Sequence, residues 1–190
     1  MTVIVSFLFG KNEFFLYLNF DGGALADFFF TYCTNLGDGI MWVPFILFFI
    51  FYKRKLLPLV IGAMLISTLF VQISKNYIYP NEARPIKAIT EQVKIHTVKG
   101  VEVHTTNSFP SGHTTTVFCI FLLGCLFIPS IIFLIIGCTL ALLTAYSRIY
   151  LAQHFPVDVG AGMITAVISI CISLWIQRLF NNKQLPIHNS

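Results

Sequence analysis

A stretch of twelve residues, 147–158, places an arginine, a histidine and an aspartate between two long apolar runs. A helix that faces lipid does not keep such groups without a functional reason. His154 and Asp158 are four residues apart, and Pro156 between them suits the first turn of a new helix. The carboxylate of Asp158 can therefore reach back and orient the imidazole ring, as activated nucleophiles require.

Arg148 adds a permanently charged, planar fork of donors to the same stretch, and this side chain suits the binding of a phosphate. Together these residue types favour a site in which a histidine acts beside a bound anion. The alternative that stays open at this point is a polar junction between two helices, in which His154 and Asp158 only satisfy each other.

The composition indicates an integral membrane protein. Apolar residues make up 56% of the 190 residues, charged residues make up 11%, and the mean hydropathy is +0.80. Soluble domains carry about 25% charged residues. We expect a single domain over residues 1–190 and, because a basic region and a cleavage site are missing at the N-terminus, no signal peptide. The five cysteines show no metal-site or CxxC spacing, so we interpret them as small core residues.

The apolar runs predict an all-α bundle of about five membrane spans within a core of residues 39–180. The spans are expected near residues 40–52, 56–74 and 112–128, from the break at 129–130 to about 147, and over 156–180. Residues 1–38 are interrupted by charges. We therefore expect two short amphipathic helices there, roughly 11–20 and 23–36, that lie in the membrane interface.

A long polar segment, 75–111, separates the second and third expected spans. Within it, residues 93–97 and 101–105 alternate apolar and polar side chains around Lys99-Gly100, which predicts a β-hairpin. His96 and His104 fall on the polar phase of this alternation. We expect both histidines to face solvent rather than to bind a metal.

Basic residues orient the expected bundle. Residues 53–55 are Lys-Arg-Lys, Arg178 and Lys183 follow the last span, and none of the eight acidic residues lies among them. Positive residues mark the cytoplasmic side. Segment 75–111, the turn around His154 and the N-terminal helices should therefore all face outward.

This topology brings the unusual residues to one membrane depth. Ser111 is a good helix N-cap, the N–H groups after it can bind an anion, and Gly112 lets a ligand approach the backbone. Each feature alone has a structural explanation, such as helix capping or a basic side chain that reaches lipid headgroups. Their joint position favours one site, which comprises Lys75, Arg84, Ser111, Gly112, His113, Arg148, His154 and Asp158.

Two motifs resemble signatures of the type 2 phosphatidic acid phosphatase family: Pro110-Ser-Gly-His113, and Ser147-Arg148 followed by His154 and Asp158. The family's first signature is a lysine followed after six residues by Arg-Pro. Here eight residues separate Lys75 from Arg84-Pro85, and Tyr77 stands where the family has its lysine. We expect two residues within 76–83 to bulge, so that Lys75 keeps its contact with phosphate. The resemblance covers roughly residues 39–180.

The resemblance implies a phosphatase that works through a phosphohistidine. His154 would attack the phosphorus, Asp158 would hold its ring, and His113 would protonate the leaving lipid oxygen. The phosphate would be held by Lys75, Arg84 and Arg148, by the Ser111 hydroxyl, and by the backbone N–H groups of Ser111 and Gly112. Phosphoryl transfer needs positioning and charge neutralisation, which three fixed cations can supply. The sequence has no carboxylate cluster suited to Mg²⁺ or Zn²⁺, so we expect no metal and no cofactor.

The expected partners are a phosphorylated membrane lipid and the bilayer, with no nucleic acid, and the sequence leaves the oligomeric state open. The resemblance also implies a multi-pass protein of a bacterial cytoplasmic (inner) membrane, with a site that faces the periplasm or exterior. The candidate substrates are undecaprenyl pyrophosphate, phosphatidylglycerol phosphate, phosphatidic acid and the 1-phosphate of lipid A. No motif distinguishes among these four lipids.

Two other classes of protein share parts of this pattern. Vanadate-dependent haloperoxidases resemble the same signatures, but they are soluble proteins, and five expected spans argue against that class. A non-enzymatic protein that binds or transports lipids or anions could use the same basic cluster. A binding site needs cations but no proton donor, so the presence of both His113 and His154 with Asp158 argues against this alternative.

Overall fold

The computed structural model of the protein describes residues 2–90 and 95–183, and these residues form helices and loops without a β-strand. The α-helices are α1 (Thr2–Phe9), α2 (Lys11–Leu18), α3 (Gly23–Cys33), α4 (Trp42–Tyr52), α5 (Leu57–Ile73), α6 (Pro85–Ala88), α7 (Gly112–Phe127), α8 (Ile131–Tyr150) and α9 (Pro156–Lys183). Short 3-10 helices η1 (Thr34–Gly37), η2 (Gly39–Met41) and η3 (Arg54–Leu56) and a π-helix η4 (Ser74–Ile78) connect some of them.

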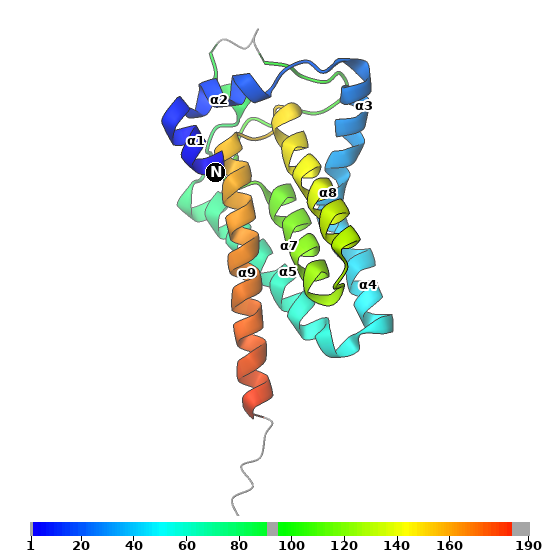
Figure 1. The fold of residues 1–190 in the computed structure, drawn as a ribbon. Coiled ribbons are helices and arrows are strands. Elements are labelled where there is room, and N and C mark those ends of the chain that lie inside the picture. The colour runs from blue at the N-terminus through cyan, green and yellow to red at the C-terminus, as the bar shows by residue number, and fades with distance from the viewer. Residues whose placement is uncertain (1, 91–94, 184–190) are drawn as a thin grey trace, which may run out of the picture.

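Helix α7 stands at the centre of the bundle and packs against α5, α8 and α9 (Figure 1). Small residues allow this close approach, as is usual where membrane helices meet. A side-chain carbon added at Gly162 of α9 would lie 2.7 Å from the carbonyl oxygen of Ser111. One added at Gly62 of α5 would lie 2.6 Å from Ser173 Oγ on α9. Gly162 therefore brings α9 against the residue that caps α7, which joins two segments of the predicted site.

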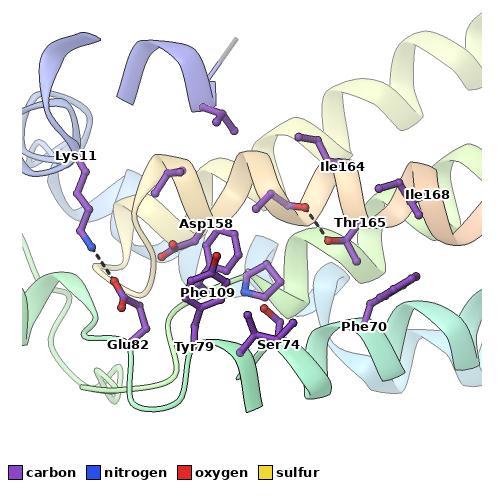
Figure 2. A pocket seen from close by; sticks show the side chains of 15 residues that line it. Lys11, Phe70, Ser74, Tyr79, Glu82, Phe109, Asp158, Ile164, Thr165 and Ile168 are labelled. Carbon is purple, nitrogen blue, oxygen red and sulfur yellow. Dashed lines mark hydrogen bonds and ion pairs between the residues drawn. The ribbon is translucent and has the colours of Figure 1, made fainter. Parts of the chain in front are cut away.

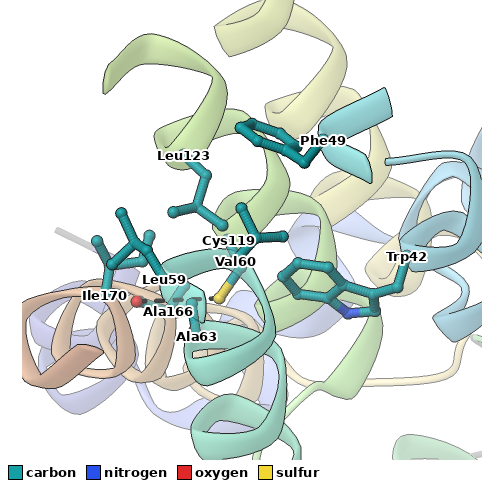
Figure 3. Packing of buried hydrophobic residues seen from close by; sticks show 9 residues of the cluster. All are labelled: Trp42, Phe49, Leu59, Val60, Ala63, Cys119, Leu123, Ala166 and Ile170. Atoms are coloured by element: carbon teal, nitrogen blue, oxygen red, sulfur yellow. Dashed lines mark hydrogen bonds between the residues drawn. The ribbon is translucent and has the colours of Figure 1, made fainter. Parts of the chain in front are cut away.

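Two apolar clusters fix the arrangement of the helices. The larger one joins α4, α5, α7 and α9 through nine buried side chains: Trp42, Phe49, Leu59, Val60, Ala63, Cys119, Leu123, Ala166 and Ile170 (Figure 3). The second cluster packs Phe15 of α2 against Phe155, with ring centroids 5.5 Å apart, and also includes Ile89 and Ile95. This second cluster fixes α2 and the long loop above the turn that carries His154.

The number of membrane spans depends on how two elements are counted. Helices over Arg54–Ile78, Ile131–Tyr150 and Pro156–Phe180 are long and apolar enough to cross a membrane. Segments Gly23–Gly37 and Gly39–Tyr52 pass the same test only as a pair that is bent by 55°, so the described residues give three spans or up to four. The predicted five also include α7, which has only 16 residues but lies inside the bundle.

The second expected interfacial helix, 23–36, differs from the prediction. Helices α1 and α2 lie at one end of the bundle, but α3 runs along α8 (Figure 1). Phe30 of α3 packs against Tyr150 of α8, with ring centroids 4.6 Å apart. Asp27 makes this segment look too polar for a bundle helix, yet its carboxylate accepts a hydrogen bond from the Tyr150 hydroxyl. Because the Asp27 carboxylate is hydrogen-bonded, α3 can pack along α8 instead of lying in the membrane interface.

The predicted β-hairpin is wrong for the described part of the loop. Residues 93 and 94 lie outside the described residues, and residues 95–105 contain a turn at Lys99-Gly100 but no strand. The backbone of this segment is bonded elsewhere. Asn19 binds both the N–H and the carbonyl oxygen of His96, at 2.8 and 3.2 Å, and Thr105 O accepts a bond from the Arg84 N–H at 2.9 Å. The alternation reflects side-chain burial against the helices and not strand pairing.

The two histidines of this loop have different surroundings. His104 is exposed, as predicted, but the side chain of His96 is only 12% exposed, so that part of the prediction is wrong. Its Nε2 lies 3.0 Å from Asp27 Oδ1, and its ring packs against Tyr150. Ligand atoms of Asp21, Asp27 and His96 lie within 4.8 Å of one another. The hydrogen bond between His96 and Asp27 explains why these side chains lie close together, so their proximity does not indicate a metal site.

Candidate active site

His154 and Asp158 face each other where α9 begins. Nδ1 of His154 lies 3.6 Å from Oδ2 of Asp158, and both side chains are almost completely buried. The same carboxylate oxygen accepts hydrogen bonds from Ser108 Oγ at 2.5 Å and from the Phe155 N–H at 3.0 Å. Because the carboxylate is fixed and faces Nδ1, the opposite ring nitrogen, Nε2, is the atom available to attack a substrate.

The turn before α9 places His154 by a compact helix ending. Ala152 has a φ of 54°, and the N–H groups of Gln153 and His154 both donate to the carbonyl oxygen of Arg148, at 2.9 and 3.0 Å. A left-handed residue and such backbone bonds commonly end a helix. Pro156 then starts α9 without the loss of a needed N–H. These backbone bonds hold Arg148 and His154 close together at the end of α8.

Arg148 is buried and has an unused donor. One terminal nitrogen donates to Thr34 Oγ1 at 2.6 Å, whereas Nε has no hydrogen-bond partner among the described residues. A buried guanidinium N–H without a partner costs free energy, and an anion oxygen is the acceptor that best satisfies it. Arg148 thus has the local geometry of an anion-binding residue.

Arg84 is fixed by the loop around it. Its terminal nitrogen NH1 donates to the carbonyl oxygen and to Oε1 of Gln153, at 3.0 and 2.9 Å, and its Nε donates to Thr106 O at 2.8 Å. Gln153 in turn donates to Glu102 O at 2.8 Å. Burial lowers the pKa of Arg84, and the nearby Asp158 raises it. The guanidinium is therefore preorganised beside the turn that carries His154.

Lys75 lies in the π-helix η4, which directly follows α5. The wider turn is closed by a bond from the Tyr79 N–H to Ser74 O at 2.8 Å, and Asn81 then takes a left-handed φ of 62°. A π-turn holds one residue more than an α-turn. It can therefore take up one of the two extra residues between Lys75 and Arg84. The contact of Lys75 with phosphate stays a prediction.

Ser111 caps α7 at the centre of the site. Its Oγ accepts hydrogen bonds from the N–H and the hydroxyl of Thr114, at 3.4 and 2.9 Å. Its own N–H donates to the Asp158 carbonyl oxygen at 3.1 Å, so the predicted role of this N–H in anion binding does not fit the structure. The Ser111 hydroxyl proton and the N–H groups of Gly112 and His113 are the remaining candidate donors at this helix start.

The predicted cations act together on His154. Burial lowers the pKa of His154 well below its usual value near 6.5, and the charges of Arg84, Arg148 and Lys75 lower it further, as does His113. Three segments that are far apart in the sequence therefore meet at this ring. The imidazole is held in its neutral form, which is the form a nucleophile needs.

The whole arrangement matches known proteins. Residues 56–183 match the PAP2 superfamily, which is well over half of the chain. The chain belongs to the PAP2 superfamily. Its described residues also include helices that are long and apolar enough to cross a membrane, as is expected of a membrane-embedded lipid phosphatase of this superfamily. No curated protein sequence matches the chain significantly.

Two crystal structures resemble this PAP2 phosphatase. LpxE of Aquifex aeolicus superposes with a TM-score of 0.76 at 28% identity, covering 87% of this chain and 94% of that chain. A transmembrane phosphatidylglycerolphosphate phosphatase of PAP2 type from Bacillus subtilis superposes with a TM-score of 0.64 at 20% identity, covering 98% of this chain and 95% of that chain. At that identity the second similarity concerns the fold alone.

Three residues of this PAP2 site were missed by the sequence analysis. Ser108 fixes the carboxylate of Asp158, Gln153 holds Arg84, and Thr34 binds Arg148. Gln153 directly precedes the predicted His154, and Ser108 lies three residues before the predicted Ser111, which is a weak signal. Thr34 and Arg148 are 114 residues apart, and no local pattern in the sequence relates them.

Two hollows reach the site of this PAP2 phosphatase from different sides. A pocket of about 660 Å³ reaches Asp158 between α1, α5 and α9, with Phe70, Ile164 and Ile168 along its apolar part (Figure 2). Lys11 and Glu82, an ion pair at 2.9 Å, lie at its polar part (Figure 2). A groove of about 220 Å³ runs between the start of α7, α5 and the 3-10 helices, and His113 lines it.

Proposed function

We propose that the protein removes phosphate from a membrane lipid through a phosphohistidine on His154, at the outer face of a bacterial cytoplasmic membrane. The observation that carries this proposal is the electrostatic setting of His154. Three cations act on a buried imidazole, and the Nε of one of them, Arg148, has no partner among the described residues. Such a site suits an anion that the ring can attack.

The reaction proceeds in two displacements. Nε2 of His154 attacks the phosphorus in line, the bond from phosphorus to the lipid oxygen breaks, and His113 donates a proton to that oxygen. Water then attacks the phosphohistidine, His113 takes a proton from the water, and inorganic phosphate leaves. Asp158 stabilises the positive charge that forms on the ring, because its carboxylate faces Nδ1 at 3.6 Å.

The charge on the transferred group is neutralised by side chains. Lys75, Arg84 and Arg148 would bind the oxygens of the phosphate, with the Ser111 hydroxyl and the Gly112 N–H as neutral donors. Fixed donors and cations that match the developing charge lower the barrier to phosphoryl transfer. These three cations occupy the role that metal ions have in other phosphoryl transfer enzymes, so we propose turnover without a metal or another cofactor.

The orientation and the substrate range remain parts of this proposal. Residues 53–55 lie at the end of the bundle opposite α1 and α2, and this position supports an outward-facing site (Figure 1). We also propose that residues 1–190 form one domain. A phosphorylated lipid would keep its chains in the bilayer while its head reaches His154. Undecaprenyl pyrophosphate, phosphatidylglycerol phosphate, phosphatidic acid and lipid A 1-phosphate are the candidate substrates.

A labelling experiment tests the proposal directly. Purified protein is mixed with radiolabelled phosphatidic acid, quenched within milliseconds, and the protein-bound label is measured alongside released phosphate. We expect label that is stable in base and lost in acid, and none in His154→Ala. A non-enzymatic lipid-binding or transport protein would bind the lipid without releasing phosphate, and that result would replace the proposal.

A further inference from the structure

The end of α3 lies against the last two turns of α8. Thr144 and Arg148 are four residues apart on one face of α8, and they bond two consecutive residues, Cys33 and Thr34. The Thr144 hydroxyl donates to the carbonyl oxygen of Cys33 at 3.3 Å, and a terminal nitrogen of Arg148 donates to Thr34 Oγ1 at 2.6 Å. Both threonines are buried. These bonds hold the segment around Thr34 against the part of α8 that presents Arg148.

The short helix η1, which begins at Thr34, also lies against the start of α7. A side-chain carbon added at Gly37, the last residue of η1, would lie 2.7 Å from the carbonyl oxygen of His113. Glycine therefore permits a close approach of the two backbones at this point. One turn of chain thus meets Arg148 through Thr34 and His113 through Gly37. This turn precedes residues 56–183, the part of the chain that matches the PAP2 superfamily.

The bond from Arg148 to Thr34 orients the guanidinium without neutralising its charge. Arg148 is only 7% exposed and forms no ion pair with any of the described residues. A guanidinium carries five N–H donors in one plane, so a bond at one terminal nitrogen limits the directions of the other donors. A carboxylate in place of the hydroxyl would bind more strongly but would compete with an anionic ligand for the same charge. The hydroxyl leaves that charge and the Nε donor available.

We propose that Thr34 is a positioning residue of the active site, whose hydroxyl holds the guanidinium of Arg148 so that Nε faces the phosphate of the substrate. Thr34 acts through Arg148 and does not itself contact the substrate. The inference rests on the proposed function, in which Arg148 binds the phosphate. It gives the N-terminal part of the chain, outside the three signature motifs, a part in phosphate binding.

Inorganic phosphate, the product, is a probe that occupies the site without chemistry. Its inhibition constant, Ki, is measured against hydrolysis of the candidate lipid that the wild type cleaves fastest, in detergent micelles. For Thr34→Val we expect Ki to rise by about tenfold, because a misdirected guanidinium loses one charge-assisted bond to the anion. The value of kcat/KM should fall by at least the same factor, because the same oxygens are bound in the transition state. A smaller fraction of folded protein would lower the apparent kcat but would leave Ki unchanged.

Three further variants isolate the hydroxyl of Thr34. Thr34→Ser keeps the hydroxyl, so its Ki should stay within about twofold of wild type. Thr34→Ala removes the hydroxyl with a smaller side chain and should raise Ki as Thr34→Val does, so either variant decides if the other does not fold. Thr31→Val is the matched control on α3, because Thr31 Oγ1 is buried without a hydrogen-bond partner among the described residues. The control removes no such bond, and its Ki should equal that of wild type.

Each result has one meaning. An unchanged Ki in Thr34→Val and Thr34→Ala overturns the inference, while the phosphatase itself stands. An equal rise of Ki in Thr31→Val, or no recovery in Thr34→Ser, also overturns it, because the effect would then come from the packing of α3. If the wild-type protein releases phosphate from none of the four candidate lipids, the proposed function is refuted, and the inference falls with it.

Discussion

At the residue scale, the chemistry depends on one imidazole that its surroundings keep neutral. Burial and the charges of Arg84, Arg148 and Lys75 all favour the uncharged ring of His154. The oxygen of Asp158 that faces Nδ1 already accepts hydrogen bonds from Ser108 and from the Phe155 N–H, which hold the carboxylate in place. In the proposed mechanism the same carboxylate stabilises the phosphorylated ring, whose charge is positive, so the site would match the intermediate more than the resting enzyme.

The first prediction concerns the two histidines. His154→Ala should insert normally and lose turnover by several orders of magnitude, because one member of a catalytic unit is removed. His113→Ala should be nearly inactive on lipid phosphates but partly active on p-nitrophenyl phosphate, whose leaving group needs no proton. Phosphate release from each variant on both substrates is the measurement. An equal loss of activity on both substrates would show that His113 is not the proton donor to the leaving group.

The second prediction concerns the titration of His154. Its pKa lies well below the usual 6.5, so lowering the pH from 7 to 6 should leave it neutral, whereas an ordinary histidine would gain a proton. Removing a positive charge should raise the pKa, so Arg84→Gln is expected to shift the titration of His154 to higher pH. NMR of protein with ¹⁵N-labelled histidine measures this, with His154→Ala to assign the signal. A wild-type signal that titrates near 6.5 or above would contradict the burial argument.

At the element scale, the sequence predicted the helices that carry the site because apolar runs mark them and the polar motifs lie at their ends. Its errors have a common cause. His96 was predicted to face solvent, and Asp27 was one of the charges that placed residues 23–36 in the interface, yet the two side chains bond each other across 69 residues. Asn19 likewise binds the carbonyl oxygen of Ile149, 130 residues away. Pairs so distant in the chain leave no periodic signal, so single-sequence reasoning assigns each partner to water.

The third prediction concerns the irregular helix η4, which carries Lys75. If the π-turn directs this ammonium to the phosphate, Lys75→Ala should lower kcat/KM about ten- to a hundredfold, since bonds to charged groups contribute roughly 1.5–3 kcal/mol. Lys75→Arg should recover only part of the loss, because a planar fork does not replace a point charge. Lys87→Ala is the matched control, because Lys87 is an exposed lysine on the same long loop. If the activity of Lys75→Ala lies within twofold of wild type, Lys75 does not bind the phosphate, and Arg84 and Arg148 bind it without Lys75.

At the scale of the whole molecule, charge and chemistry occupy opposite ends of the bundle. The basic residues 53–55 follow α4, and Lys53 donates to Phe127 O at the turn between α7 and α8, at 3.3 Å. The site residues, the long loop and helices α1 and α2 lie at the other end (Figure 1). A cytoplasmic basic end therefore requires an outward-facing site, and one measurement of orientation decides both.

The last prediction tests this orientation with single cysteines in a background where the five native cysteines have been replaced. Glu102→Cys lies on the long loop, where the native side chain is 87% exposed, and it should react with a membrane-impermeant thiol reagent in intact spheroplasts. Pro129→Cys, at the exposed turn between α7 and α8, should react only after lysis. Neither position alters a basic residue, so the substitutions leave the charge signal for insertion intact. Labelling of Pro129→Cys alone in intact cells would place the phosphatase site in the cytoplasm, where it could reach only lipids of the inner leaflet.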